Sequence, residues 1–229
     1  MSKNIEADMK EKSPIFHALT GVKGVYTAQT GKLRCTAYRL SDRSMLLYSP
    51  VAGLGDAARE SLSILGDVSN LLAPNHYHNK GLAEYFRFFP NTNLVCSTTA
   101  LPRLSKITKL KFGGLGSLEN NLPDNTELLE PDGLKTGEIW LQIKNKGEVI
   151  WIVTDAFTAQ PTAVGEFTQE PLLLGTFPRY GVRDSELFRT WVETKISELA
   201  PTIVIPCHGG ILKCDNLGKS LSNLLRKTL

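Results

Sequence analysis

Alternating apolar and polar positions predict strands along the chain. The clearest case is residues 138–144, where every second residue is apolar, followed by an Asn-Lys-Gly turn and a second apolar run at 148–154. This pattern is typical of a β-hairpin with one buried face. The other predicted strands are short apolar stretches bounded by polar or turn-forming residues, at 33–40, 44–51, 93–97, 126–129 and 202–206.

Apolar residues three and four positions apart predict four helices, over residues 56–65, 81–89, 184–199 and 217–225. Two of these helices begin with an aspartate, Asp56 and Asp184, which is suited to accept hydrogen bonds from the first backbone N–H groups of a helix. Two stretches rich in turn-forming residues, 115–135 and 156–183, have no sustained period and are predicted to be surface excursions. The first half of the chain is therefore predicted to form strands followed by helices.

Length and composition suit one domain that spans residues 1–229, because 229 residues with a hydrophobic content of 41% can bury a substantial core. The net charge of +3 is too small and dispersed to indicate a nucleic-acid partner. The most basic stretch, 103–111, is interpreted as the solvated face of an amphipathic segment. No apolar run suits a membrane span, and residues 1–12 do not resemble a signal peptide. We expect a cytoplasmic protein without nucleic-acid or membrane partners, and its oligomeric state stays open.

The four cysteines are predicted to be reduced thiols, because Cys35, Cys96, Cys207 and Cys214 are scattered without a paired spacing. Cys207 directly precedes His208, but neighbours along a strand point to opposite faces. A nucleophile paired with a base is therefore disfavoured, and a small buried apolar side chain is the preferred interpretation of Cys207.

Three of the four histidines lie at the C-terminal tips of predicted strands. His76 and His78 are two positions apart, so in an extended segment both imidazoles would point the same way. His208 follows the strand at 202–206, and Asp155 ends the apolar run at 148–154. His17 has no such setting and is interpreted as incidental.

This constellation resembles the metallo-β-lactamase superfamily. Its pattern is a strand running into HxHxDH, a later Gly-His, a strand ending in Asp and a final strand ending in His-Gly, and the same order extends through nearly the whole chain. The resemblance implies an α/β (α+β) fold, a four-layer αββα sandwich of the metallo-β-lactamase type. The sequence departs from the motif where Lys80 and Gly81 replace its Asp-His and where Leu134 replaces its later histidine.

The resemblance implies a reduced metal site with at most one divalent ion, zinc or iron, and with His76, His78, Asp155 and His208 as ligands. Two histidines and a carboxylate are a recognised ligand set for one such ion. Because zinc lowers the pKa of bound water to about 7, the expected reaction is hydrolysis, and the resemblance implies an ester, thioester, lactone or phosphoester as the substrate. Asp155 is the expected catalytic residue.

Lys80 supports a second interpretation, in which the chain is a non-catalytic, metal-free binding or scaffold module. Its ammonium, placed where the family has a metal-binding aspartate, would pair with Asp155 and replace the charge of the missing ion. An iron oxygenase is a third class, but by resemblance it normally needs the histidine that Leu134 replaces.

A small-molecule substrate or ligand is the expected partner. Tyr77, Tyr180 and Arg183 are candidates to contact it, provided that the stretch at 156–183 folds over the site.

Overall fold

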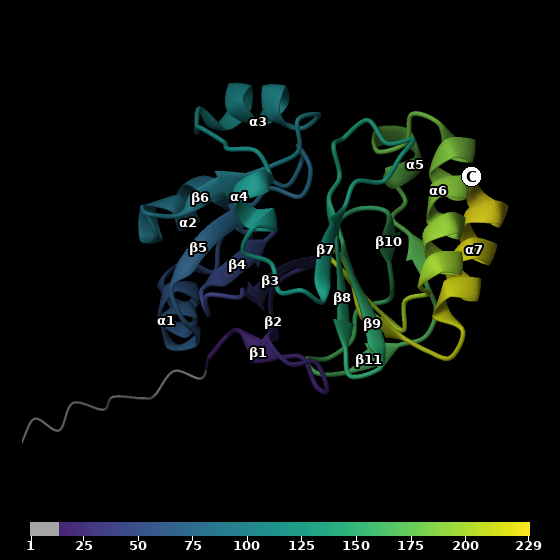
Figure 1. The fold of residues 1–229 in the computed structure, drawn as a ribbon, viewed down its shortest axis with the longest axis horizontal. Coiled ribbons are helices and arrows are strands. Elements are labelled where there is room, and N and C mark those ends of the chain that lie inside the picture. The colour runs from purple at the N-terminus through teal and green to yellow at the C-terminus, as the bar shows by residue number, and fades with distance from the viewer. Residues whose placement is uncertain (1–13) are drawn as a thin grey trace, which may run out of the picture.

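Two β-sheets of six strands each lie face to face in the computed structural model, which describes residues 14–229 (Figure 1). The prediction about a signal peptide in residues 1–12 lies outside the described residues. The first sheet has the strand order β1-β2-β3-β4-β5-β6, and the second has the order β11-β14-β13-β9-β8-β7. A small separate sheet pairs β10 with β12.

The first sheet changes from antiparallel to parallel pairing at β4. Strands β1 to β4 pair antiparallel in chain order, whereas β4, β5 and β6 run parallel. Parallel neighbours end at the same edge of a sheet, so the chain leaves β4 and β5 side by side. The strands are β1 (His17–Ala18), β2 (Val25–Thr30), β3 (Leu33–Arg39), β4 (Met45–Tyr48), β5 (Val68–Leu72) and β6 (Asn93–Val95).

The second sheet brings two distant segments together in the same way. Strand β13 pairs parallel with β9, with Ile205 opposite Ile152, and α6 provides the crossover between them. The strands of the second sheet are β7 (Thr126–Leu129), β8 (Trp140–Asn145), β9 (Glu148–Val153), β11 (Phe167–Thr168), β13 (Ile203–Pro206) and β14 (Ile211–Lys213), and the small separate sheet consists of β10 (Phe157–Thr158) and β12 (Leu172–Leu173).

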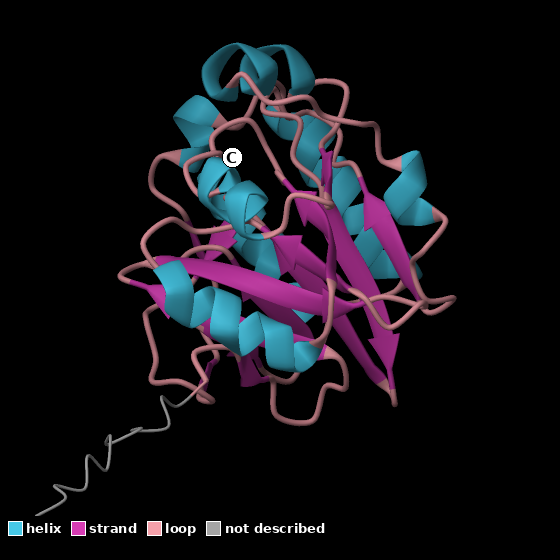
Figure 2. Ribbon diagram, turned by 90° about the vertical axis from the view of Figure 1, so that its left-hand side faces the viewer, coloured by secondary structure: helices cyan, strands magenta, loops and turns pink. Residues whose placement is uncertain are grey.

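Helices cover the outer face of each sheet, as Figures 1 and 2 show. Apolar side chains fill three layers: one between the two sheets, one between the first sheet and α1 to α3, and one between the second sheet and α5 to α7. The predicted four-layer αββα sandwich is therefore confirmed. The helices are α1 (Gly55–Leu65), α2 (Leu82–Phe88), α3 (Leu101–Thr108), α4 (Gly116–Glu119), α5 (Phe177–Tyr180), α6 (Ser185–Glu198) and α7 (Leu217–Thr228).

Two predicted details of the elements have different outcomes. Asp184 caps α6 as expected, since its carboxylate accepts a hydrogen bond from the Leu187 backbone N–H at 3.0 Å. Asp56 does not cap α1, because the helix begins one residue earlier and Asp56 instead forms an ion pair with Arg59. The four cysteines are free thiols, and Cys207 is buried as predicted.

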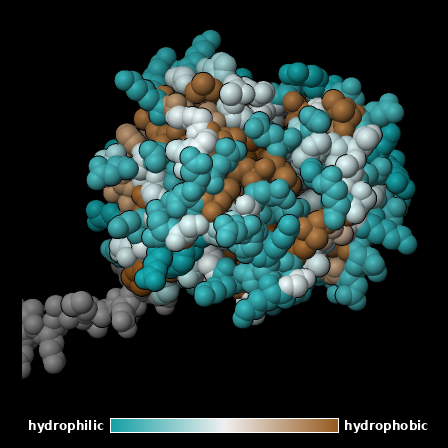
Figure 3. All heavy atoms as spheres, viewed as in Figure 1, coloured by the Kyte–Doolittle hydropathy of each residue, from teal (hydrophilic) through white to brown (hydrophobic). Residues whose placement is uncertain are grey.

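Polar residues predominate on the face shown in Figure 3, and hydrophobic residues gather between the two halves. Within residues 14–229, no helix combines the length and the apolar character that a membrane crossing needs.

Candidate metal centre

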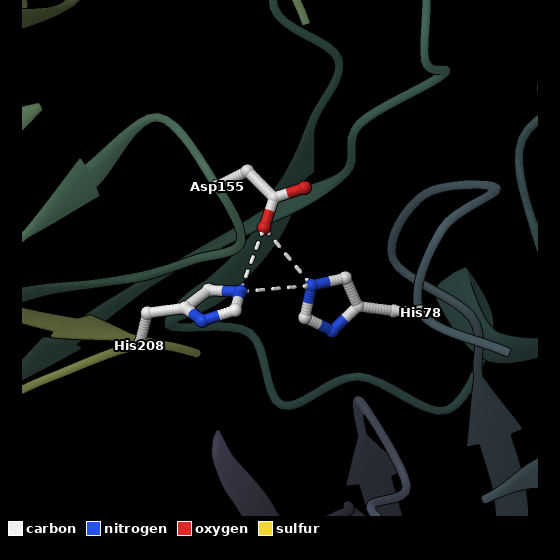
Figure 4. A group of neighbouring side chains, drawn as sticks. All are labelled: His78, Asp155 and His208. Atoms are coloured by element: carbon white, nitrogen blue, oxygen red, sulfur yellow. Dashed lines mark hydrogen bonds and ion pairs between the residues drawn. The ribbon is translucent and has the colours of Figure 1, made fainter. Parts of the chain in front are cut away.

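Three side chains from the two sheets converge at one end of the sandwich (Figure 4). His78 follows β5, Asp155 follows β9 and His208 follows β13. The Nε2 atoms of His78 and His208 each lie 3.0 Å from Oδ1 of Asp155. The two Nε2 atoms are 3.4 Å apart. We call these three residues the His–Asp–His cluster.

The topology explains why residues so distant in sequence meet. Strands β9 and β13 are parallel neighbours, so Asp155 and His208 emerge at the same edge of the second sheet. The first sheet is fixed against the second by Tyr48, whose buried hydroxyl donates to the Ile139 carbonyl at 2.6 Å and lies 2.8 Å from Oγ1 of Thr154. This contact sets the spacing of the two sheets directly beneath the cluster.

Two polar side chains orient the cluster. Ser49 Oγ lies 2.7 Å from Nδ1 of His78, and Asn75 donates from Nδ2 to Oδ2 of Asp155 at 2.7 Å. When Ser49 Oγ accepts a hydrogen bond from Nδ1–H of His78, the Nε2 atom of this neutral imidazole keeps a lone pair for a metal ion. Both residues were missed by sequence reasoning, because nothing in their local pattern distinguishes them from ordinary turn residues.

His76 does not join the cluster, contrary to the expectation that it and His78 point the same way. Residues 75–80 form a turn instead of an extended strand, because Oδ1 of Asn75 accepts hydrogen bonds from the backbone N–H groups of Tyr77 and His78. The His76 ring lies against Tyr77, and its buried Nε2 has no partner within residues 14–229. Burial and then the charge of Arg103 lower the pKa of His76.

The predicted Lys80–Asp155 ion pair is also absent. In the described part of the chain, Asp155 pairs with His78 and His208, while Lys80 forms no ion pair and its side chain is exposed. Asn75 already binds the second carboxylate oxygen. Neither oxygen of Asp155 therefore needs an ammonium partner, and the predicted pairing of Lys80 with Asp155 is wrong.

Gly81 and Leu134, the other two positions that depart from the motif, are both packed against neighbouring segments of the chain. A Cβ atom on Gly81 would lie 2.2 Å from the Pro50 carbonyl oxygen, so a histidine cannot stand there without a backbone shift. Leu134 packs against the apolar layer beneath α6 and pairs with Val182, and it does not line the cavity of the site.

Glu138 is a buried acid next to the cluster that sequence reasoning missed. Its Oε1 accepts hydrogen bonds from Trp140 Nε1 at 2.7 Å and from the backbone N–H of Asp155 at 3.3 Å, and its Oε2 has no partner within residues 14–229. Burial, and then the charge of Asp155, raise the pKa of Glu138 to about 8. The only signal for it was a charged residue at the start of an apolar strand.

The pKa of Asp155 is shifted in the opposite direction to that of Glu138. Burial alone would raise its pKa, but the charges and hydrogen bonds of His78 and His208 outweigh burial and hold the pKa well below its usual range. The carboxylate is therefore ionised and available as a ligand at neutral pH.

Replacing Glu138 by glutamine is expected to change the pH dependence of stability in the metal-free protein. The pKa of Glu138 rises on folding from 4.5 to about 8. Its contribution to the free energy of unfolding is fully present below pH 4.5 and is lost as the pH rises through about 8. The pKa of Asp155 is lowered on folding, so its contribution to the free energy of unfolding changes only at pH values below those at which Glu138 titrates. Glutamine cannot release a proton, so the free energy of unfolding of the variant should not show this decline with rising pH.

Denaturant titrations of both proteins between about pH 5 and about pH 9 measure the difference. The same decline of stability in the parent and in the Glu138→Gln variant would contradict the assignment.

The donor set of the cluster fits one divalent metal ion. Ligands about 2.1 Å from a tetrahedral ion are about 3.4 Å apart, and the three donor atoms here are separated by 3.0, 3.0 and 3.4 Å. The residues between 14 and 229 contain no other group of three histidine, cysteine or acidic side chains that converge in this way.

The cluster opens into a cavity of about 650 Å³. Tyr77 and Tyr180, which were candidates for substrate contact, line it, whereas Arg183 does not. The stretch at 156–183 contributes five residues to the wall, so this excursion does fold over the site: Leu174, Thr176, Phe177, Tyr180 and Gly181.

Comparisons with known structures agree with the fold. No protein-family model and no curated protein matches the sequence. Among solved structures, a metallo-β-lactamase from Pontibacter korlensis has a TM-score of 0.59 at 11% identity, with 93% of this chain and 99% of that chain covered. The mono-zinc form of the metallo-β-lactamase FIM-1 from Pseudomonas aeruginosa has a TM-score of 0.60 at 14% identity, with 93% and 94% covered.

A third similar structure is the metal-soaked flavodiiron core of Flv1 from Synechocystis, with a TM-score of 0.56 at 14% identity. The match covers 88% of this chain but only 58% of that chain, so this chain spans little more than half of the flavodiiron core. The chain has the metallo-β-lactamase fold, as the resemblance of its motifs predicted.

Proposed function

We propose that the chain is a metal-dependent hydrolase that holds a single divalent ion, zinc or iron, between His78, Asp155 and His208. The convergence of their three donor atoms is the observation that carries this proposal. The similar structures add support, since one is a mono-zinc metallo-β-lactamase and another is a metal-soaked flavodiiron core. The expected substrates are esters, thioesters, lactones or phosphoesters. His76 is left out of the ligand set.

The residues around the cluster have distinct roles in this proposal. Ser49 and Asn75 hold His78 and Asp155 in the orientation that a metal ion needs. A divalent ion bound there supplies Lewis acidity toward a carbonyl or phosphoryl oxygen. The cavity admits the substrate to the open side of the cluster, and its apolar wall limits the access of water.

A non-catalytic, metal-free binding module is the second candidate function. It is favoured by the hydrogen bonds of Asp155, whose two oxygens both have protein partners. A buried carboxylate with such partners is tolerated without an ion.

Elemental analysis of untagged protein separates the two candidates. We expect one equivalent of zinc or iron per chain after dialysis, and a large loss of metal in a His208→Ala variant. His17→Ala is the matched control, because His17 is exposed and lies outside the cluster. Activity against a panel of esters, thioesters, lactones and phosphoesters should disappear with a chelator and return with the metal.

Other metal contents would decide against the proposal. Two equivalents per chain would contradict a mononuclear site, and no metal after growth with zinc and iron would favour the metal-free module.

A further inference from the structure

The cavity above the His–Asp–His cluster is large enough for a small organic molecule and is mainly apolar. Its volume of about 650 Å³ lies within the range of small-molecule sites. The apolar part of its wall comes from both halves of the chain: Leu33, Pro50, Val51, Ala52, Leu174 and Phe177. A ligand with an apolar body would therefore be desolvated against both halves at once.

The wall of this cavity contains two basic side chains and one acidic side chain, and only the acidic one has ion-pair partners among the described residues. Asp155 is the only carboxylate in the wall, and it is engaged by His78 and His208. Lys80 and Arg103 also line the cavity, and neither forms an ion pair within the described residues 14–229.

The nearest acid on α2 does not compensate these two cations. Both carboxylate oxygens of Glu84 accept hydrogen bonds from backbone N–H groups of the loop before α1, those of Gly53 and Gly55. Glu84 is not part of the cavity wall. The cavity therefore presents two positive charges without an ion-pair partner among residues 14–229.

Arg103 is held in place at the rim. Its guanidinium lies over the Tyr77 ring, 5.1 Å from the ring centroid, which is a cation–π arrangement. A guanidinium so positioned loses little rotamer freedom when it binds a carboxylate or phosphate through two parallel N–H groups. Tyr77 and Tyr180 are 40% and 46% exposed, so aromatic faces also stand open at the rim.

We propose that this cavity binds a small amphipathic anion, with its apolar body against the apolar wall and its carboxylate or phosphate group between Lys80 and Arg103. The role of this anion as a substrate rests on the hydrolase proposed above, whereas its binding does not need the metal. An unmatched pair of cations next to a mainly apolar cavity discriminates against neutral ligands of the same shape.

Binding of matched probes to the metal-free protein tests this inference. The probes are 1-naphthylacetate, 1-naphthyl phosphate and the uncharged 2-(1-naphthyl)ethanol, titrated by fluorescence or calorimetry in the presence of a chelator. We expect at least one anion to bind about tenfold more tightly than the alcohol, with an advantage that shrinks as salt increases. Comparison of the two anions identifies the preferred head group.

Charge-removing variants locate the effect. Lys80→Gln with Arg103→Gln should bring the anions to the affinity of the alcohol and leave the alcohol unchanged. Lys106→Gln with Lys111→Gln is the control, because it removes the same charge from exposed residues near Arg103 that do not line the cavity. Both double variants should unfold at the parent's midpoint, since all four side chains are exposed.

Equal affinity for all three probes, or equal losses in the two double variants, would overturn the proposal. Selective anion binding without any turnover by the metal-loaded protein would contradict the hydrolase and leave the anion site standing.

Discussion

Replacing Asp155 by asparagine is expected to lower the affinity for zinc by more than about 100-fold, equivalent to about 2.7 kcal/mol. The carboxylate oxygen lies 3.0 Å from Nε2 of both His78 and His208 and carries the only negative charge of the cluster. Asparagine keeps the shape and removes that charge, so the loss reports on ligation more than on packing. Calorimetric titration with zinc near neutral pH measures it.

The matched control for this experiment is Asp132→Asn, because Asp132 is exposed and does not line the cavity. The control should bind zinc as the parent does. Parental affinity in the Asp155→Asn variant would show that the metal, if bound, is held elsewhere.

Replacing Gly81 by alanine is expected to reduce the free energy of unfolding by at least about 3 kcal/mol. The new Cβ would lie 2.2 Å from the Pro50 carbonyl oxygen and 2.9 Å from the Ala52 backbone nitrogen. Both contacts are to backbone atoms that cannot move without displacing the loop between β4 and α1. The backbone conformation of Gly81 is ordinary (φ −82°), so the cost is steric.

Gly114→Ala is the control, because a Cβ there meets nothing within 4 Å. Chemical denaturation of both variants gives the comparison. Equal stability of the two variants would mean that the loop before α1 yields easily at Gly81, and a histidine at this position would then be feasible.

The strands and helices could be predicted mainly where the pattern of apolar and polar residues is compatible with only one type of secondary structure. The alternation in residues 138–144 and the Asn-Lys-Gly turn identify the β8–β9 hairpin, and the predicted strand at 126–129 coincides with β7. The two-residue strands β1, β10, β11 and β12 were not predicted, because segments of this length carry no clear period and form only through their partners in the fold. Their formation is a tertiary effect.

The sequence indicated which strand ends contribute to the site, but it did not indicate how the side chains are arranged there. Asp155 and His208 were identified because a polar residue ends a buried strand, and parallel pairing then brings them together. The direction of His76 was mispredicted because the Asn75 side chain folds the segment into a turn. Glu138 could not be identified, since its neighbours in space come from β8 and from the end of β9.

The hydroxyl of Tyr48 couples the geometry of the His–Asp–His cluster to the packing of the protein interior. It joins the two sheets one residue before Ser49, which orients His78, and it contacts Thr154, one residue before Asp155. Any substitution in the central apolar layer that widens or narrows the gap between the sheets will therefore also move one half of the cluster against the other. Over evolutionary time, such a chain cannot change freely in its core and keep the geometry of the cluster, so its packing and its site must change together.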